Sequence, residues 1–211
     1  MTMRLQEVHP SLVHYPIAFL PLAIGADAVG KLTGSKTLLA TGKLGIALTA
    51  VTGALAGVAG LIAQEEVELR TPRADDMLVT HRTLNVAVVG IATAMAVIRA
   101  RREKPTFRYL AAGIASIGAM AYSAYLGGKM VYEQGVGVEP AGGIAEGHGP
   151  ELRWDRAEEL TEHALEDVRE GIRHAAQTVA EGKFVPTLMG EPERPGGAGA
   201  TAPRAADGGE P

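Results

Sequence analysis

The sequence contains no cysteine among its 211 residues. This absence excludes disulfide bonds, thiolate metal ligands, iron–sulfur clusters and covalently attached c-type haem within the chain. Aromatic residues make up only 4% of the sequence, and the formal net charge is −4. Basic residues occur in short clusters between apolar runs rather than on one long face, so no nucleic-acid partner is expected.

The mean hydropathy of +0.09 averages two different compositions. Apolar residues are concentrated before residue 133, whereas the rest of the chain is charged or rich in Gly, Pro and Ala. Four segments of the first part are apolar over the roughly 20 helical residues that cross a bilayer. They predict an all-α integral membrane protein, a bundle of four transmembrane helices within residues 1–138, with spans at 11–32, 42–63, 77–98 and 107–132.

The basic residues near the span ends predict the orientation of the chain, because cytoplasmic loops of membrane proteins are enriched in Lys and Arg. Two loops carry such an excess, one between the first and second spans and one between the third and fourth; the residues are Lys31, Lys36, Lys43, Arg99, Arg101, Arg102, Lys104 and Arg108. Both loops are expected in the cytoplasm, which places the N- and C-termini outside the bacterial inner membrane.

Three regions follow the spans: a Gly-rich linker (139–150), an amphipathic helix (151–185) and a disordered tail (186–211). The helix has apolar residues at steps of three and four from Leu160 to Val179 and a mostly acidic opposite face. This pattern favours packing against another helix, in this chain or in a second copy, over binding an anionic lipid surface. His163 and His174 are three turns apart and are expected to be solvated.

Polar residues gather at the extracytoplasmic ends of the spans, where a site is expected. His14 and His81 lie a turn or more inside the predicted boundary and are the best candidates to meet across the bundle, with Asn85 and Glu65 in support. Two facing imidazoles can ligate a b-type haem, histidines with a carboxylate can bind a divalent metal such as zinc or copper, and a protonatable cluster can mark an ion path.

Helical geometry separates His9 from His14, since five residues correspond to about 140° around a helix. The two histidines share one ion only if the chain around Pro10 and Pro16 departs from a helix. Asp27 lies near the other end of the first span, four residues before Lys31, and a structural ion pair between these two residues is expected.

Three segments carry a resemblance to a known family: HPSLVHYPIAF (9–19), THRTLN (80–85) and YLGGKMVYEQGVGV (125–138). They resemble the signatures of a bacterial family of four-span membrane proteins catalogued as a transmembrane domain of unknown function. Family members commonly carry an Asp-Trp pair after the second span, where this chain has Gln64 and Glu65. Relatives fused to Rieske or c-type cytochrome domains imply a redox setting, and hence a redox protein as partner.

These patterns predict a membrane-embedded module, not an enzyme, that binds haem b or a metal near its outer face in an electron-transfer context. The alternative is a structural or assembly subunit without a cofactor, which docks a partner or a second copy through its C-terminal helix. A small ion or solute transporter ranks third, because Asp27 is the only acidic residue available in the inner half.

Overall fold

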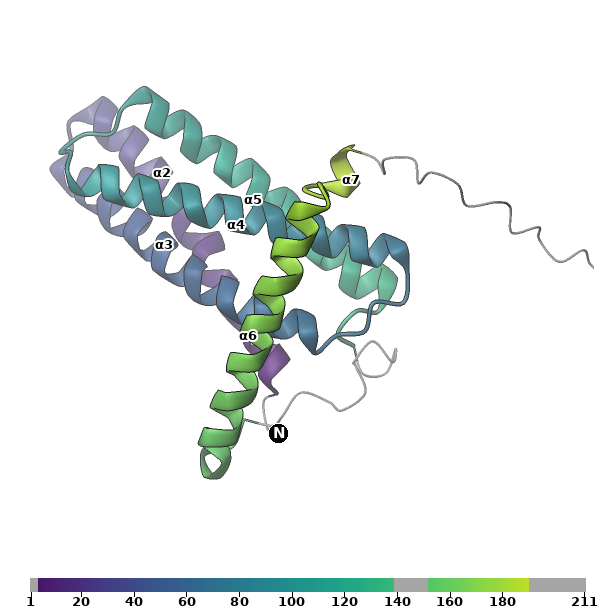
Figure 1. Cartoon of the computed structure of the whole chain (residues 1–211). Coiled ribbons are helices and arrows are strands. Elements are labelled where there is room, and N and C mark those ends of the chain that lie inside the picture. The colour runs from purple at the N-terminus through teal and green to yellow at the C-terminus, as the bar shows by residue number, and fades with distance from the viewer. Residues whose placement is uncertain (1–3, 139–151, 190–211) are drawn as a thin grey trace, which may run out of the picture.

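The computed structural model describes residues 4–138 and 152–189, which contain helices and no strands. Its main body is a bundle of four long helices, each long and apolar enough to cross a membrane (Figure 1). They are α2 (His14–Thr33), α3 (Lys36–Glu65), α4 (Pro72–Ala100) and α5 (Phe107–Gln134). A single 3-10 turn, η1 (Leu5–Glu7), and the short helix α1 (Val8–Leu12) precede them. The predicted fold class is confirmed.

Local chemistry sets the ends of these helices. Ser35, Thr71 and Thr106 precede α3, α4 and α5, and each side-chain oxygen accepts a hydrogen bond from a backbone N–H of the first turn. Helices α2 and α5 end at Gly34 and Gly135, whose φ angles of 72° and 69° lie in the left-handed region that suits glycine. The helices therefore continue past one or both ends of the predicted spans.

The first span consists of two helices that meet at Val13. Pro16 has no backbone N–H to donate to the carbonyl of Leu12, and its ring crowds that carbonyl. The neighbouring hydrogen bonds persist: Val13 donates to the His9 carbonyl at 3.1 Å, and Ile17 donates to the Val13 carbonyl at 3.3 Å. The backbone at Val13 stays helical, with φ −61° and ψ −23°, so α1 and α2 together form the first span.

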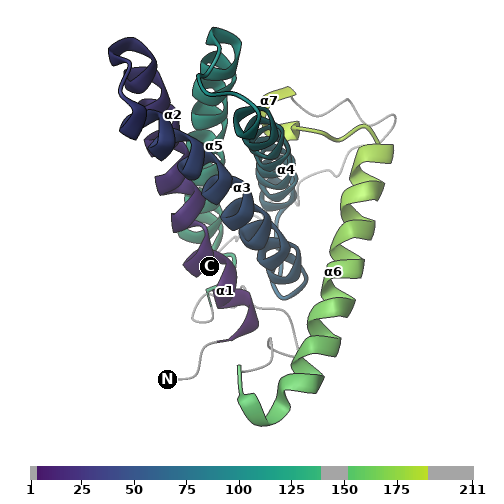
Figure 2. The same cartoon turned by 90° about the vertical axis from the view of Figure 1, so that its left-hand side faces the viewer.

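Neighbouring helices run up and down, and each of the four packs against two others. Helices α2 and α4 each contact α3 and α5, so α2 and α4 lie diagonally opposite. The α2–α3 and α4–α5 connections lie together at one end, here called the basic end, and η1 lies with the α3–α4 connection at the opposite, N-terminal end (Figure 2). The core between them is aliphatic and includes Leu20, Ile24, Ile46, Val88 and Met95.

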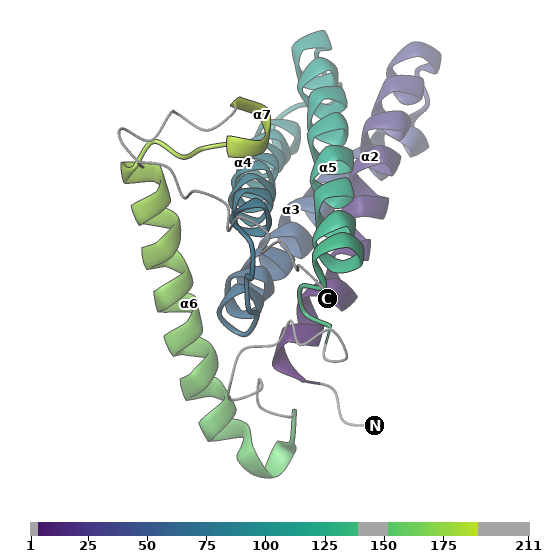
Figure 3. The same ribbon diagram turned by 90° about the vertical axis from the view of Figure 1, so that its right-hand side faces the viewer.

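Helix α6 (Ala157–Ala180) follows the single turn η3 (Trp154–Arg156) and lies along one flank of the bundle beside α3 and α4 (Figures 2 and 3). Its backbone approaches α3 closely at Gly171, where a Cβ atom would be 2.9 Å from the Leu61 carbonyl oxygen. The buried positions Asp167 and Gly171 are not apolar, whereas Ile172 and Val179 of the predicted apolar stripe are exposed. The docked face therefore overlaps the stripe only in part, at the half-buried Leu160, Ala164, Val168 and Ala175.

The C-terminal boundary differs from the prediction. Residues 186–189, expected to be disordered, form the short helix α7 (Pro186–Met189), which packs on α4. The Thr187 backbone N–H donates to Thr80 Oγ1 at 3.1 Å. The predicted linker at 139–150 and the remainder of the predicted tail, 190–211, lie outside the described residues.

Candidate functional site

The residues predicted to form a site at the N-terminal end do not all come together. His14 begins α2 with its side chain exposed, so it does not face His81 across the bundle. Asn85 is half-buried on α4, one turn beyond His81. Glu65 turns to the opposite flank of α3, where it contacts His174 of α6. The residue that meets His81 is His9.

His9 and His81 form a ring pair inside the bundle. Their ring centroids are 6.3 Å apart and their planes are inclined by 83°. His9 lies on α1 and His81 on α4, so the pair joins the first span to the third across the bundle diagonal. The prediction that His14 faces His81 is wrong, because His9 is the histidine that faces inward and His14, about 140° away around the helix axis, is exposed.

Each ring of this pair makes its hydrogen bond through Nδ1. His9 Nδ1 lies 2.8 Å from the Ala56 carbonyl oxygen, and His81 Nδ1 lies 2.8 Å from the Ser123 carbonyl oxygen. A carbonyl only accepts, so each Nδ1 carries the proton and each Nε2 keeps its lone pair. No hydrogen bond among the described residues uses either Nε2. Metal-binding histidines are commonly oriented in this way, with the second ring nitrogen donating to a carbonyl.

The backbone around the pair is fixed by close packing. Ser123 Oγ lies 3.0 Å from His81 Nδ1 and also donates to the His81 carbonyl at 3.3 Å. A Cβ atom at Gly60 would lie 3.0 Å from His9 Nδ1, and one at Gly127 would lie 3.3 Å from His81 Cε1. Glycine at these two positions allows α3 and α5 to approach the rings.

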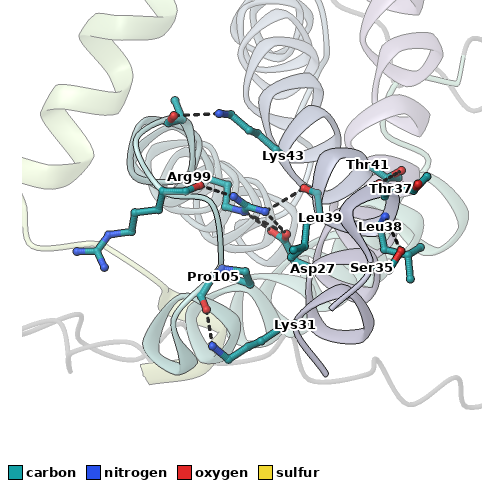
Figure 4. Close-up of polar contacts among 12 residues, drawn as sticks. Asp27, Lys31, Ser35, Thr37, Leu38, Leu39, Thr41, Lys43, Arg99 and Pro105 are labelled. Atoms are coloured by element: carbon teal, nitrogen blue, oxygen red, sulfur yellow. Dashed lines mark hydrogen bonds and ion pairs between the residues drawn. The ribbon is translucent and has the colours of Figure 1, made fainter. Parts of the chain in front are cut away.

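A buried ion pair lies at the basic end of the bundle. Asp27 on α2 is 0% exposed and Arg99 on α4 is 1% exposed, with Arg99 Nη2 2.8 Å from Asp27 Oδ1. Arg99 Nε donates to both carboxylate oxygens, and Nη2 also donates to the Leu39 carbonyl at 2.9 Å (Figure 4). These bonds join three helices through groups that would otherwise be costly to bury.

The partner of Asp27 was predicted wrongly. Lys31 instead donates to the Pro105 carbonyl at 2.8 Å (Figure 4). Its Nζ also lies 4.8 Å from the centroid of the Phe107 ring. Lys43 makes a similar bond to the Ala100 carbonyl at 3.0 Å. Two of the three lysines of the α2–α3 hairpin thus bind carbonyls at the α4–α5 connection. Asp27 pairs with Arg99, 72 residues away, which had been assigned only to the loop charge.

Helix α6 brings a second polar cluster to the N-terminal end of the bundle, where α3 ends. His163 Nε2 lies 2.6 Å from Glu66 Oε1 and 3.5 Å from Asp167 Oδ2, and His174 Nδ1 lies 3.1 Å from Glu65 Oε1. Both histidines, predicted to be solvated, are half-exposed, and each meets a carboxylate at the end of α3. The sequence did not reveal these contacts, for which the adjacent Glu65 and Glu66 were the available signal.

Comparison with known proteins gives a family and no closer relative. No curated protein and no solved structure matches the chain. A family model described as a predicted membrane protein, DUF2231, matches residues 6–140, which include α1 to α5 and both histidines of the ring pair. Helix α6 and its cluster lie beyond the matched region. The chain belongs to the DUF2231 family of predicted membrane proteins.

Proposed function

We propose that this membrane protein is a non-enzymatic module that holds a redox-active transition metal between His9 and His81 for electron transfer. The observation that carries the proposal is the pair of half-buried imidazoles, each with Nδ1 bonded to a backbone carbonyl and Nε2 without a hydrogen bond to any described residue. Imidazole nitrogen suits copper and iron, which change oxidation state. Resemblance to a family found beside redox domains supports the same chemistry.

The ring separation fits one metal atom. Two metal–nitrogen bonds of about 2.0–2.1 Å each bring two imidazoles to opposite sides of one ion, and ring centroids 6.3 Å apart are compatible with this span. A b-type haem would use the same two axial nitrogens. The haem macrocycle would fit only if α3 and α5 moved apart, because these helices already approach the histidine rings at Gly60 and Gly127. The packing therefore favours a single ion over haem.

The proposal includes a bacterial inner membrane and an orientation. With the basic end in the cytoplasm, the His9–His81 pair belongs to the extracytoplasmic half, from which a soluble redox partner can be reached. A transport role is disfavoured because Asp27, the acidic residue of the inner half, is fully buried and bound to Arg99. The docking-subunit alternative loses support because α6 packs on its own bundle.

Purified protein in detergent tests the proposal through its visible spectrum and its metal content. We expect about one copper or iron per chain, lost in His9→Ala and in His81→Ala. His14→Ala is the matched control, since this exposed histidine lies close by on α2 and its removal should leave the metal in place. A Soret band would identify haem as the form in which iron is held. Protein that carries neither haem nor metal after expression in metal-supplemented medium would contradict the proposal.

A further inference from the structure

Three ligand-type side chains converge where α6 crosses the end of α3. Glu66 follows the last residue of α3, and His163 and Asp167 are one turn apart on α6. One nitrogen or oxygen atom from each lies within 4.8 Å of the other two. Glu66 lies nearly 100 residues before His163 in the sequence. The cluster therefore forms only when α6 is docked on the bundle.

Two of the three groups are buried without adequate partners. Glu66 and Asp167 are each 8% exposed, although carboxylates are rarely buried unless paired. Asp167 Oδ2 makes no hydrogen bond with any described residue. Burial, together with nearby carboxylates, raises the pKa of Asp167 to about 6. The hydrogen bond to Glu66 raises the pKa of His163. When both carboxylates are ionised, protonated His163 supplies one positive charge against their two negative charges.

The surroundings do not supply a second positive charge. Glu65 and Glu166 lie near Asp167, and the ion pairs of the described residues join no lysine or arginine to Glu66 or Asp167. The guanidinium of Arg82, on α4, donates hydrogen bonds to Gln64 Oε1 and Thr178 Oγ1. Within the described part of the chain, the cationic partner of the two carboxylates is His163, which is charged only when protonated. A bound cation would compensate the buried negative charge.

We propose that Glu66, His163 and Asp167 bind one divalent cation of the zinc class and thereby fasten α6 to the bundle. One imidazole and two carboxylates form a ligand set that zinc accepts, with a fourth position left for water. The nitrogen ligand disfavours Mg²⁺ and Ca²⁺, which prefer oxygen. His163 is half-exposed, so an ion can reach the site from solvent. This site shares no residue with the His9–His81 pair and does not depend on it.

Isothermal titration of chelator-treated full-length protein with ZnCl₂ tests the proposal, with MgCl₂ as the comparison ion. We expect one zinc per chain at this site and no competing binding of magnesium. Asp167→Asn preserves the shape of the side chain and His163→Gln removes the nitrogen ligand; each should weaken zinc binding about tenfold or more, because even outer-shell changes cost 10–100-fold. Glu159→Gln, at an exposed position of the same helix, should bind as the wild type does.

A second measurement monitors the docking of α6. Because the chain has no cysteine, single cysteines at exposed positions 73 and 159 can carry nitroxide labels for a distance measurement by pulsed electron paramagnetic resonance. Zinc should narrow the distance distribution, and Asp167→Asn should abolish this effect. The same titration in His81→Ala should give unchanged zinc affinity, which separates this site from the proposed redox centre. Wild-type affinity in both Asp167→Asn and His163→Gln, or no zinc binding by the wild type, would overturn the inference.

Discussion

The buried ion pair of Asp27 and Arg99 is expected to contribute strongly to the stability of the bundle. Both side chains are inaccessible, so removing either leaves an uncompensated buried charge. Arg99→Met should lower the free energy of unfolding by about 3–5 kcal/mol, measured by unfolding in mixed detergent micelles. Asp27→Asn combined with Arg99→Met should recover much of this loss, because no charge then remains. Equal stability of Arg99→Met and the wild type would contradict the assignment.

Gly42 is a second residue on which this ion pair depends. A Cβ atom there would overlap Cγ and Oδ1 of Asp27, so Gly42→Ala must displace the carboxylate. We expect Gly42→Ala to destabilise the protein by about 1–3 kcal/mol, as overpacking commonly does. Gly57→Ala provides the control, since a Cβ atom at this position would have open space around it. It should be neutral or stabilising by thermal denaturation, because alanine favours the helix. Similar losses in both variants would indicate a general effect of helix glycines.

Single-residue contacts were the least predictable part of the site. Local spacing suggested Lys31 for Asp27, but lysine at that position reaches the Pro105 carbonyl. Arg99 was visible only as a loop charge, because nothing in the sequence says that α4 extends to residue 100 and turns Arg99 inward. A contact between distant residues depends on the rotation of each helix about its axis. Hydropathy alone does not determine that rotation.

Among the helices, the rotation of the first span about its axis had the largest effect on the predicted site. A helix keeps His9 and His14 about 140° apart, and the greater predicted depth of His14 favoured it as the ligand. The structure turns His9 to His81 and leaves His14 exposed. The expectation for His81 differs: its position on α4 could be predicted, and it does face the bundle interior.

The contact between α6 and α3 should depend on pH when metal is removed. The pKa values of Asp167 and His163 are both raised in the docked state, so the docked helix binds more protons than the free helix. Docking should therefore weaken as pH rises from about 4 through 7, as Asp167 ionises and His163 loses its proton. The groups that face this cluster are Glu65, Glu66, Glu166, Glu170, Arg82 and His174.

Label distances between positions 73 and 159, recorded in chelator across this pH range, measure the effect. Asp167→Asn should flatten the profile, because an amide does not ionise. Glu159→Gln with the label moved to exposed position 162 is the control, and its profile should match the wild type. With zinc present the dependence should reverse, since protons compete with the metal for the same ligands. Docking that strengthens with pH in chelator would contradict the assigned pKa directions.

For the whole molecule, the sequence was sufficient to predict four spans and an all-helical bundle. Each span is a long apolar segment separated from the next by a polar connection, and such a pattern leaves few alternatives in a bilayer. The position of α6 could not be predicted, because its docked face combines His163, Asp167 and Gly171 with only part of its apolar stripe. Polar and small-residue contacts carry little periodic signal.

Reporter fusions test the proposed orientation of the whole chain. Alkaline phosphatase, which is active only outside the cytoplasm, should be active when fused after Val138 and inactive when fused after Gly34. Fusions of green fluorescent protein at the same positions should give the opposite pattern and control for expression. This result follows from the basic residues of the two hairpin loops. Active phosphatase after Gly34 would contradict the orientation.

The carbonyl contacts of Lys31 and Lys43 link insertion to assembly. In the proposed orientation, these two lysines are among the charges that hold the loop of the first hairpin in the cytoplasm, and they also bind the second hairpin. Moving these lysines to invert the orientation would also remove their hydrogen bonds to the Pro105 and Ala100 carbonyls, which join the two hairpins. The orientation of this protein in the membrane and the packing of its two hairpins are therefore expected to change together.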